Sequence, residues 1–323
     1  MVGAVGGTSW LVRGLSVRLA ALALLSVVAF GLVHLAPGDP ADRLLRASGG
    51  EPTPEAVAAM RADLGLDRPL PEQYVVWLTH VVRLDFGRSY ASGQPVADEF
   101  LDRLPATLEL TAAALVMVVA LGLGAGLLAA ITGGWTDGLI RGVALAASSA
   151  PAYLVGVLLI TAFGVRLHWL PVAGNSQWDS FVLPAMALAI GYLPLQVRLF
   201  RAGLLTALAE QFATVAQAKG LSRRQVLLRH ALPRALGPNV QALGLAAAQM
   251  LGGVIVIETL FAWPGVGRLA TESILVRDYP VIQTYLVVLG VCYLLINVTT
   301  DLIHGGIDPT ARKGLSPEPV HHV

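Results

Sequence analysis

Six long stretches of this sequence contain no Asp, Glu, Lys or Arg, and they constrain its fold more than any other feature. Each is 17 to 23 residues long, close to the ~20 residues that a helix needs to cross a ~30 Å hydrocarbon layer. Hydrocarbon offers the backbone no outside hydrogen-bond partner, so each stretch must be helical. The six windows are Leu19–Gly38, Leu110–Thr132, Gly142–Gly164, Phe181–Val197, Asn239–Ile257 and Val281–Thr300.

The composition agrees with these windows. Hydrophobic residues make up 55% of the chain and charged residues 13%, whereas a soluble domain is about 25% charged. A soluble enzyme, a disordered chain and a secreted disulfide scaffold are therefore excluded, and the single Cys292 excludes an intramolecular disulfide. A net charge of +1 gives no bulk attraction to nucleic acid. The sequence predicts an all-α polytopic membrane bundle of six transmembrane helices with a small helical outer segment.

Lys and Arg are distributed unevenly, and this distribution predicts the orientation of the spans. The loop between spans four and five holds seven basic residues, and Arg13, Arg18, Arg141, Arg312 and Lys313 belong to the same side. Only three arginines lie in the short loops of the other side. The segment between spans one and two also has seven, but it is about 70 residues long, and long loops translocate regardless of charge. We expect both termini to be cytoplasmic.

These assignments give an expected organisation. The first window is expected to remain as an uncleaved signal anchor, because no clean small-residue cleavage site follows it. The expected parts are a cytoplasmic N-terminus (1–18), a first transmembrane helix (19–38), an extracytoplasmic helical segment (39–105), a five-helix core (106–304) with a cytoplasmic loop (200–238), and a cytoplasmic tail (305–323).

The outer segment holds eleven of the 21 acidic residues and two helical patterns. The first runs over 55–64, where Gly65 supplies a C-terminal stop. The second runs over 72–82 and places Tyr74, Leu78 and Val81 on one face. Both a structural lid and a docking role remain open for this segment.

Small residues and prolines inside the windows predict how the spans pack and bend. Gly122 and Gly126 form a small-xxx-small pair, which favours close helix packing in lipid. Pro151, Pro184 and Pro194 fall inside windows and are expected to produce kinks.

Catalytic chemistry is poorly represented. No phosphate-binding loop of the G-x-x-x-x-G-K-[ST] type is present, so ATP hydrolysis is not expected from this chain. The seven histidines show no metal-ligand spacing, and we predict neither a catalytic nor a metal site. Ionisable residues near the membrane are functional candidates by default. Glu258 and Asp301 close the last two windows, where side chains reach the interface cheaply, so a structural hydrogen bond is favoured over an ion relay.

The loop between spans four and five is the most informative region. Gly220 separates two short helical patterns, and Ser222 can cap the second by accepting hydrogen bonds from its first-turn amides. Pro233 and Pro238 end the loop before the next span. From the residues alone, two interpretations remain open: docking into a groove of another protein, or a solvated basic loop.

This loop resembles the EAA loop of ABC importer permeases, which reads E-A-A, three residues, Gly, nine residues, then I-x-L-P. Aligned on Gly220, the pattern places His230, Leu232 and Pro233 at I, L and P. Thr214 replaces the glutamate, Val215 replaces the first alanine, and His230 departs from isoleucine. The form Thr-x-Ala-x-Ala-Lys-Gly-Leu-Ser is similar to the peptide and nickel branch of the family.

Other stretches resemble the B-type permease of the dipeptide, oligopeptide and nickel importers over nearly the whole chain. They are Ala36–Pro40 after the first window, Leu64–Asp67 and Asp85–Ser89 in the outer segment, Glu258–Gly267 after the fifth window, Asp278–Pro280 before the sixth, and Asn297, Asp301 and Asp308–Pro309 at the end. Asn297 thereby joins Glu258 and Asp301 as a candidate pathway or structural polar residue.

The resemblance implies a type I importer permease fold and a transport role. It implies a second homologous permease, two ATP-binding subunits that use ATP and Mg²⁺, and an extracytoplasmic substrate-binding protein as partners. Di- or oligopeptides, or a small solute such as a nickel chelate, would be the cargo. The alternatives are an ion-coupled secondary transporter, which the absence of a charge ladder disfavours, and an intramembrane enzyme or receptor. The implied ATPase-coupling residues are Thr214, Ala216, Ala218, Lys219, Gly220, Leu221, Ser222, His230, Leu232 and Pro233.

Overall fold

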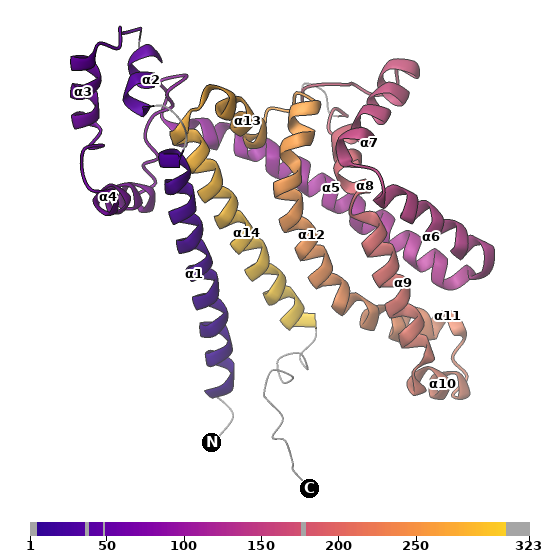
Figure 1. Ribbon diagram of the computed structural model, residues 1–323. Coiled ribbons are helices and arrows are strands. Elements are labelled where there is room, and N and C mark those ends of the chain that lie inside the picture. The colour runs from indigo at the N-terminus through magenta and orange to yellow at the C-terminus, as the bar shows by residue number, and fades with distance from the viewer. Residues whose placement is uncertain (1–4, 36–38, 48, 176–178, 308–323) are drawn as a thin grey trace. The chain divides into compact units, whose positions relative to one another are not determined.

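The computed structural model describes residues 5–35, 39–47, 49–175 and 179–307 (Figure 1). Within these ranges the regular structure is helical, and the β pairing is an isolated bridge between Arg88 and Pro95. Several residues of the sequence motifs lie outside the described ranges, namely Ala36, Pro37, Gly38, Asp308, Pro309, Arg312 and Lys313.

The chain forms two compact units. Among the described residues, the N-terminal unit consists of 10–107 and 264–292, and the central unit of 5–9, 108–263 and 293–307. Among the described residues, three helical stretches are long and apolar enough to cross a membrane, or up to five if each of two bent helix pairs counts as one span. The three are Val96–Thr132, Arg223–Leu260 and Tyr279–Gly306. The protein is therefore an all-helical membrane protein.

The third predicted window is not one continuous helix, which corrects the expectation for Gly142–Gly164. Helix α6 (Gly134–Ser148) is followed by α7 (Ala152–Leu159) after a bend of 104°. Pro151 lies at this break and disfavours helical backbone at the residue before it. A π-helical segment, η1 (Ile160–Arg166), continues from α7. The kink expected at Pro151 is confirmed.

The fourth predicted window is also bent. Helix α8 (Val182–Ile190) meets α9 (Leu193–Ala209) at an angle of 59°, next to Pro194. The kink expected at Pro184 is wrong, because Pro184 lies in the first turn of α8. Backbone N–H groups there have no partner within a helix, so proline is tolerated.

Close packing at the predicted glycine pair is confirmed in the central unit. Helix α5 (Val96–Thr132) crosses α9 at Gly122 and Gly126, and both glycines are buried. A Cβ atom at Gly122 would lie 2.9 Å from Cβ of Gln196. At Gly126 it would lie 3.0 Å from the carbonyl oxygen of Val197. The small residues therefore let the two helix backbones approach each other closely.

Replacing Gly126 with leucine is expected to destabilise the central unit by roughly 1–3 kcal/mol, because a larger side chain must push α9 away. Gly124 is a matched control, since it lies on the same helix and has no atom within 4 Å of its Cβ position. The thermal midpoint of the purified protein should fall clearly for Gly126→Leu and much less for Gly124→Leu. Equal midpoints for the two variants would contradict close packing at Gly126.

Four helices begin the chain: α1 (Val5–Leu35), α2 (Pro40–Ala47), α3 (Pro54–Asp63) and α4 (Leu70–Val82). The two helices predicted in the outer segment are confirmed as α3 and α4, whereas α2 was not expected. The side chain of Thr53 caps α3 by accepting a hydrogen bond from the N–H of Ala56 at 3.3 Å.

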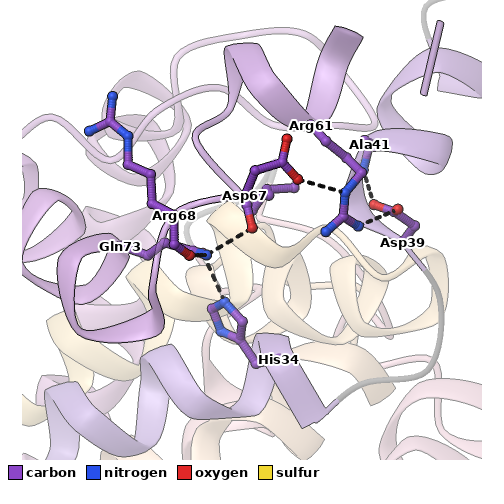
Figure 2. A network of polar contacts seen from close by, with 8 residues as sticks. His34, Asp39, Ala41, Arg61, Asp67, Arg68 and Gln73 are labelled. Carbon is purple, nitrogen blue, oxygen red and sulfur yellow. Dashed lines mark hydrogen bonds and ion pairs between the residues drawn. The ribbon is translucent and has the colours of Figure 1, made fainter. Parts of the chain in front are cut away.

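A polar network joins these four helices (Figure 2). The guanidinium of Arg61 donates to Asp39 at 2.7 Å and to Asp67 at 3.2 Å. These hydrogen bonds, chiefly the one with Asp39, raise the pKa of Arg61. Gln73 donates to the carbonyl oxygens of Leu66 and Arg68 at 3.0 and 2.7 Å. The outer segment is thereby fastened to itself and to the end of α1.

A second polar contact fastens the segment before α5 within the N-terminal unit. The hydroxyl of Ser89 donates to the buried carboxylate of Asp278 at 2.5 Å, and the N–H of Ala91 donates to the same oxygen at 3.1 Å. Burial, followed by the nearby charge of Asp278, raises the pKa of Tyr90 to about 12. The tyrosine therefore stays neutral in the physiological range.

Helix α5 precedes the central helices in the chain, and two further helices follow them. Helix α5 begins at Val96, inside the predicted outer segment, and includes Pro105, so no helix end falls at the predicted boundary. The hydroxyl of Thr107 accepts the N–H of Val266 at 2.9 Å and so caps α13 (Val266–Val276). The chain then continues into α14 (Tyr279–Ile307).

Candidate functional site

The loop between spans four and five forms two short helices separated by a turn. Helix α10 (Gln211–Ala218) follows α9, and α11 (Arg223–Val226) leads through the π-helical segment η2 (Leu227–Ala231) into α12 (Leu232–Leu260). Gly220 lies in the turn with a φ of +90°, and its N–H donates to the carbonyl oxygen of Gln217 at 2.9 Å. The predicted role of Gly220 as a break between two helices is confirmed.

Ser222 caps α11 as predicted. Its hydroxyl accepts the N–H of Gln225 at 3.3 Å, while its own N–H donates to the side-chain oxygen of Gln225 at 2.8 Å. This reciprocal capping box satisfies two amide groups that the start of a helix would leave unpaired. Turn and cap together fix the direction in which α11 leaves the turn.

The underside of the loop is packed against neighbouring helices. Ala213, Ala216 and Val226 are buried and form a cluster with half-buried Leu208, Phe212 and Leu221. In η2, Leu227 and Ala231 join a second cluster, which also contains Phe200, Leu204 and Ala207 of α9, Ala130 of α5 and Ala235 of α12. The loop is thus packed on both α9 and α12.

The opposite face of the loop is exposed. Val215 is 52% exposed, although the next residue, Ala216, is buried on the packed face. The predicted coupling residues divide accordingly: Ala216 is buried, Leu221 and Leu232 are half-buried, and the exposed ones are Thr214, Ala218, Lys219, Gly220, Ser222, His230 and Pro233.

A hollow of about 590 Å³ lies between α10 and the start of α12. Arg234 closes one side, where its guanidinium forms an ion pair with Glu210 and lies 4.2 Å from the centre of the Phe212 ring. The Phe212 and His230 rings meet edge to face at 6.1 Å. The lining is apolar and basic, and it consists of Phe212, Val215, Ala216, Lys219, Leu221, Arg229, His230, Pro233 and Arg234.

Sequence reasoning did not assign roles to Phe212 and Arg234, or to the ion pair of Glu210. Glu210 and Phe212 could have been noticed as an acidic and an aromatic residue in an otherwise basic loop. Their shared partner Arg234, however, lies 24 positions after Glu210 in the chain. A second missed pair supports the base of α9. Arg201 donates to both carboxylate oxygens of Asp137 of α6, at 2.5 and 2.6 Å.

The three polar candidates in the spans, Glu258, Asn297 and Asp301, come after this loop in the sequence. Glu258 is fully buried in α12. Its side chain therefore does not extend to an exposed interface, which differs from the expectation. The side-chain amide of Asn297 donates to the carbonyl oxygen of Tyr293, one turn earlier in α14, at 2.8 Å. Asp301 is half-buried in the same helix. Across the described residues, no group of three or more His, Cys, Asp and Glu side chains could hold a metal ion.

Comparison with known families covers most of the chain. Residues 122–313 match the family described as the binding-protein-dependent transport system inner membrane component. Residues 8–111 match the N-terminal family of the same membrane components. The chain belongs to this permease family. It is the permease subunit of an ABC importer, a multi-pass protein of the inner membrane, and is not itself an ATPase.

Individual relatives agree with this membership. The glutathione transport system permease protein GsiC of Escherichia coli (strain K12) is 39% identical over 292 residues, which cover 90% of this chain and 94% of GsiC. Among solved structures, the inward-facing MetNI methionine ABC transporter has a TM-score of 0.55 at 20% identity, covering 65% of this permease and 96% of that chain. An amino acid ABC transporter has a TM-score of 0.50 at 18% identity, covering 66% and 94%. These two likenesses concern the fold alone.

Proposed function

We propose that this permease carries small peptides, with glutathione-like or dipeptide cargo as the first class to test. The support is the 39% identity to GsiC over 90% of the chain. A small solute such as a nickel chelate is the alternative cargo. Cargo would be delivered by an extracytoplasmic substrate-binding protein.

The proposed complex contains a second homologous permease and two ATP-binding subunits. ATP and Mg²⁺ would be used by those subunits, while this chain binds neither. Six spans would cross the membrane with both termini in the cytoplasm: α1, α5, α6 with α7, α8 with α9, α12, and α14. Residues 39–105 would then lie outside the cytoplasm, and the loop at 200–238 inside.

The loop from Glu210 to Pro233 is proposed as the element that couples ATP hydrolysis to transport. The observation that carries this proposal is its two-sided construction, with a packed underside and an exposed, basic outer face. Thr214, Ala218, Lys219 and Ser222 would contact the ATPase directly. Ala216, Leu221 and Leu232 would hold the loop on α9 and α12, so that a push on the loop tilts both spans.

The apolar and basic hollow at His230 and Pro233 would receive part of the ATPase surface. Gly220 would maintain the turn between the two contacting helices. Glu258, Asn297 and Asp301 are proposed as structural polar residues, because Glu258 and Asp301 each have an interaction within the protein and Asn297 bonds within its own helix.

The test is reconstitution of the complete complex in vesicles, with the binding protein outside and ATP with Mg²⁺ inside. Labelled glutathione, a dipeptide and a nickel chelate are offered separately. We expect ATP-dependent accumulation of a peptide and none from a proton or sodium gradient without ATP. Accumulation of the nickel chelate alone would overturn the peptide assignment, and gradient-driven uptake by this chain alone would support a secondary transporter instead.

A further inference from the structure

Helix α4 of the outer segment packs against the side of α1 (Figure 1). The hydroxyl groups of Tyr74 and Ser26 are 2.8 Å apart. The Phe30 ring lies 5.5 Å from the Tyr74 ring and 5.8 Å from the Trp77 ring. Both Ser26 and Phe30 belong to the uncharged window of α1, so α4 lies beside the apolar part of that helix.

The contacts also give the level of α4 along α1. Phe30 precedes Leu35, the last residue of α1, by five positions, which is about 8 Å at a helical rise of 1.5 Å per residue. Amphipathic helices at a membrane surface bury their apolar face about 5–10 Å below it. If α1 ends near the membrane surface, α4 therefore lies at the depth of such a helix.

Two adjacent residues fix the rotation of α4 about its own axis. Gln73 contacts His34 at 3.2 Å, whereas Tyr74 contacts Ser26. His34 and Ser26 are eight positions apart, or about 12 Å along α1. The side of α4 beyond Gln73 therefore faces the end of α1, and the side beyond Tyr74 faces the middle of α1.

These two sides differ in polarity as an interfacial helix requires. With 3.6 residues per turn, the side beyond Tyr74 carries Val75, Leu78 and Val82. Val75 is 57% exposed and Val82 is 75% exposed. The side beyond Gln73 carries exposed Glu72 and His80 together with Val76. The apolar side thus points toward the middle of the membrane span and the charged side away from it.

The neighbouring surface of α1 has the same apolar character. Leu24 and Val27 are 67% and 51% exposed, and Val27 lies next to the strip that Tyr74 contacts. Tyr and Trp side chains such as Tyr74 and Trp77 favour the boundary between headgroups and acyl chains. Residues 19–35 of α1 and 73–82 of α4 contain no Asp, Glu, Lys or Arg.

From these observations we propose that α4 is embedded in the lipid interface beside α1, with Val75, Leu78 and Val82 in contact with acyl chains. The occupant of this apolar face is therefore the lipid bilayer. This inference rests on the proposed function in one respect, since it takes α1 as the first membrane span. It gives the outer segment a membrane-anchoring role rather than that of a lid in water.

The test uses the assembled complex in nanodiscs, in a Cys292→Ala background. Single cysteines carry a spin label in the variants Val75→Cys, Val82→Cys, Glu72→Cys, His80→Cys and Val27→Cys. Collision with lipid-soluble oxygen is compared with collision with water-soluble chromium oxalate. We expect the oxygen-to-chromium ratio to be above one at positions 75 and 82 and below one at the matched control positions 72 and 80.

The label at position 27 separates the two ways in which the proposal can fail. If that label collides mainly with chromium oxalate, α1 is not a span and the proposed topology fails. If it collides mainly with oxygen while position 82 is open to chromium oxalate, only the interfacial placement of α4 is overturned. Shielding of position 82 from both reagents would assign this face to a protein partner and would also overturn the proposal. Because the labelled positions are exposed, each variant should assemble, and elution of the intact complex checks this.

Discussion

Replacing Gly220 with valine is expected to lower ATP-driven uptake by at least about tenfold, while the protein still inserts into the membrane. Gly220 has a φ of +90°, and left-handed backbone costs a residue with a Cβ roughly 1–2 kcal/mol. A β-branched residue is especially unfavourable there. One to two kcal/mol is a factor of about 5–30 in population, so the native turn would lose population to other backbone conformations by that factor. The measurement is peptide uptake by the reconstituted complex, with membrane content followed in parallel.

The surroundings of Gly220 make this experiment specific to backbone conformation. No atom lies within 4 Å of the position that its Cβ would occupy, so valine meets no steric collision. Asparagine adopts positive φ more readily than valine, and Gly220→Asn should therefore retain more uptake. Gly138→Val is the control variant, because it places valine at a helical glycine that also has open space around it. Normal ATP-driven uptake by Gly220→Val would rule out the coupling assignment.

Replacing Arg201 with alanine is expected to lower the thermal midpoint by about 5 °C or more, because it leaves a buried carboxylate without its main partner. Asp137 is 6% exposed, and Arg201 binds both of its oxygens. Arg141 lies 3.5 Å away and is largely exposed, so it cannot substitute fully. Because this pair joins α6 to α9, uptake should also fall. The measurements are thermal unfolding of the purified protein and uptake by the complex.

Two further variants separate the ion pair from the loss of a long side chain. Arg141→Ala removes the longer and more exposed contact of Asp137 and should change the thermal midpoint little. Combining Asp137→Asn with Arg201→Gln removes both charges while retaining hydrogen-bonding groups, and this double variant should be more stable than Arg201→Ala alone. If Arg201→Ala and the double variant unfolded at the same temperature, the isolated charge would not be the cause.

Local patterns predicted the elements whose stability depends on nearby residues. The stop at Gly65 marked the end of α3, and the shared face of Tyr74, Leu78 and Val81 located α4. Ser222 was identified as the cap of α11 because a cap acts within one helical turn. The glycines of α5 were predicted to allow close packing, which holds because a missing Cβ has the same effect on whichever helix lies opposite.

Hydropathy windows were less informative about bends. They gave Gly142–Gly164 as one helix, whereas Pro151 separates α6 from α7 (Ala152–Leu159) by 104°. The windows count charges and cannot show backbone direction. They also missed the early start of α5 at Val96, because Asp98, Glu99 and Asp102 can occupy exposed turns of a helix that later becomes apolar.

The candidate site divides in the same way. Its position, its central glycine and its resemblance to the coupling loop were evident in the order of residues from Thr214 to Pro233. The ion pair between Glu210 and Arg234 and that between Asp137 and Arg201 were not, since the partners come from different helices. Which of the loop residues face outward was also undecided until packing on α9 buried Ala213, Ala216 and Val226.

By itself, the sequence determined that this protein is a helical membrane protein and which loop carries the family pattern, because the cost of charge in hydrocarbon acts on each residue wherever it packs. The tertiary structure alone decided which faces meet. It placed Gln196 against Gly122, Arg201 on Asp137, and the aromatic face of α4 on α1. Such contacts depend on the rotation and crossing of whole helices, and these are set by many side chains at once.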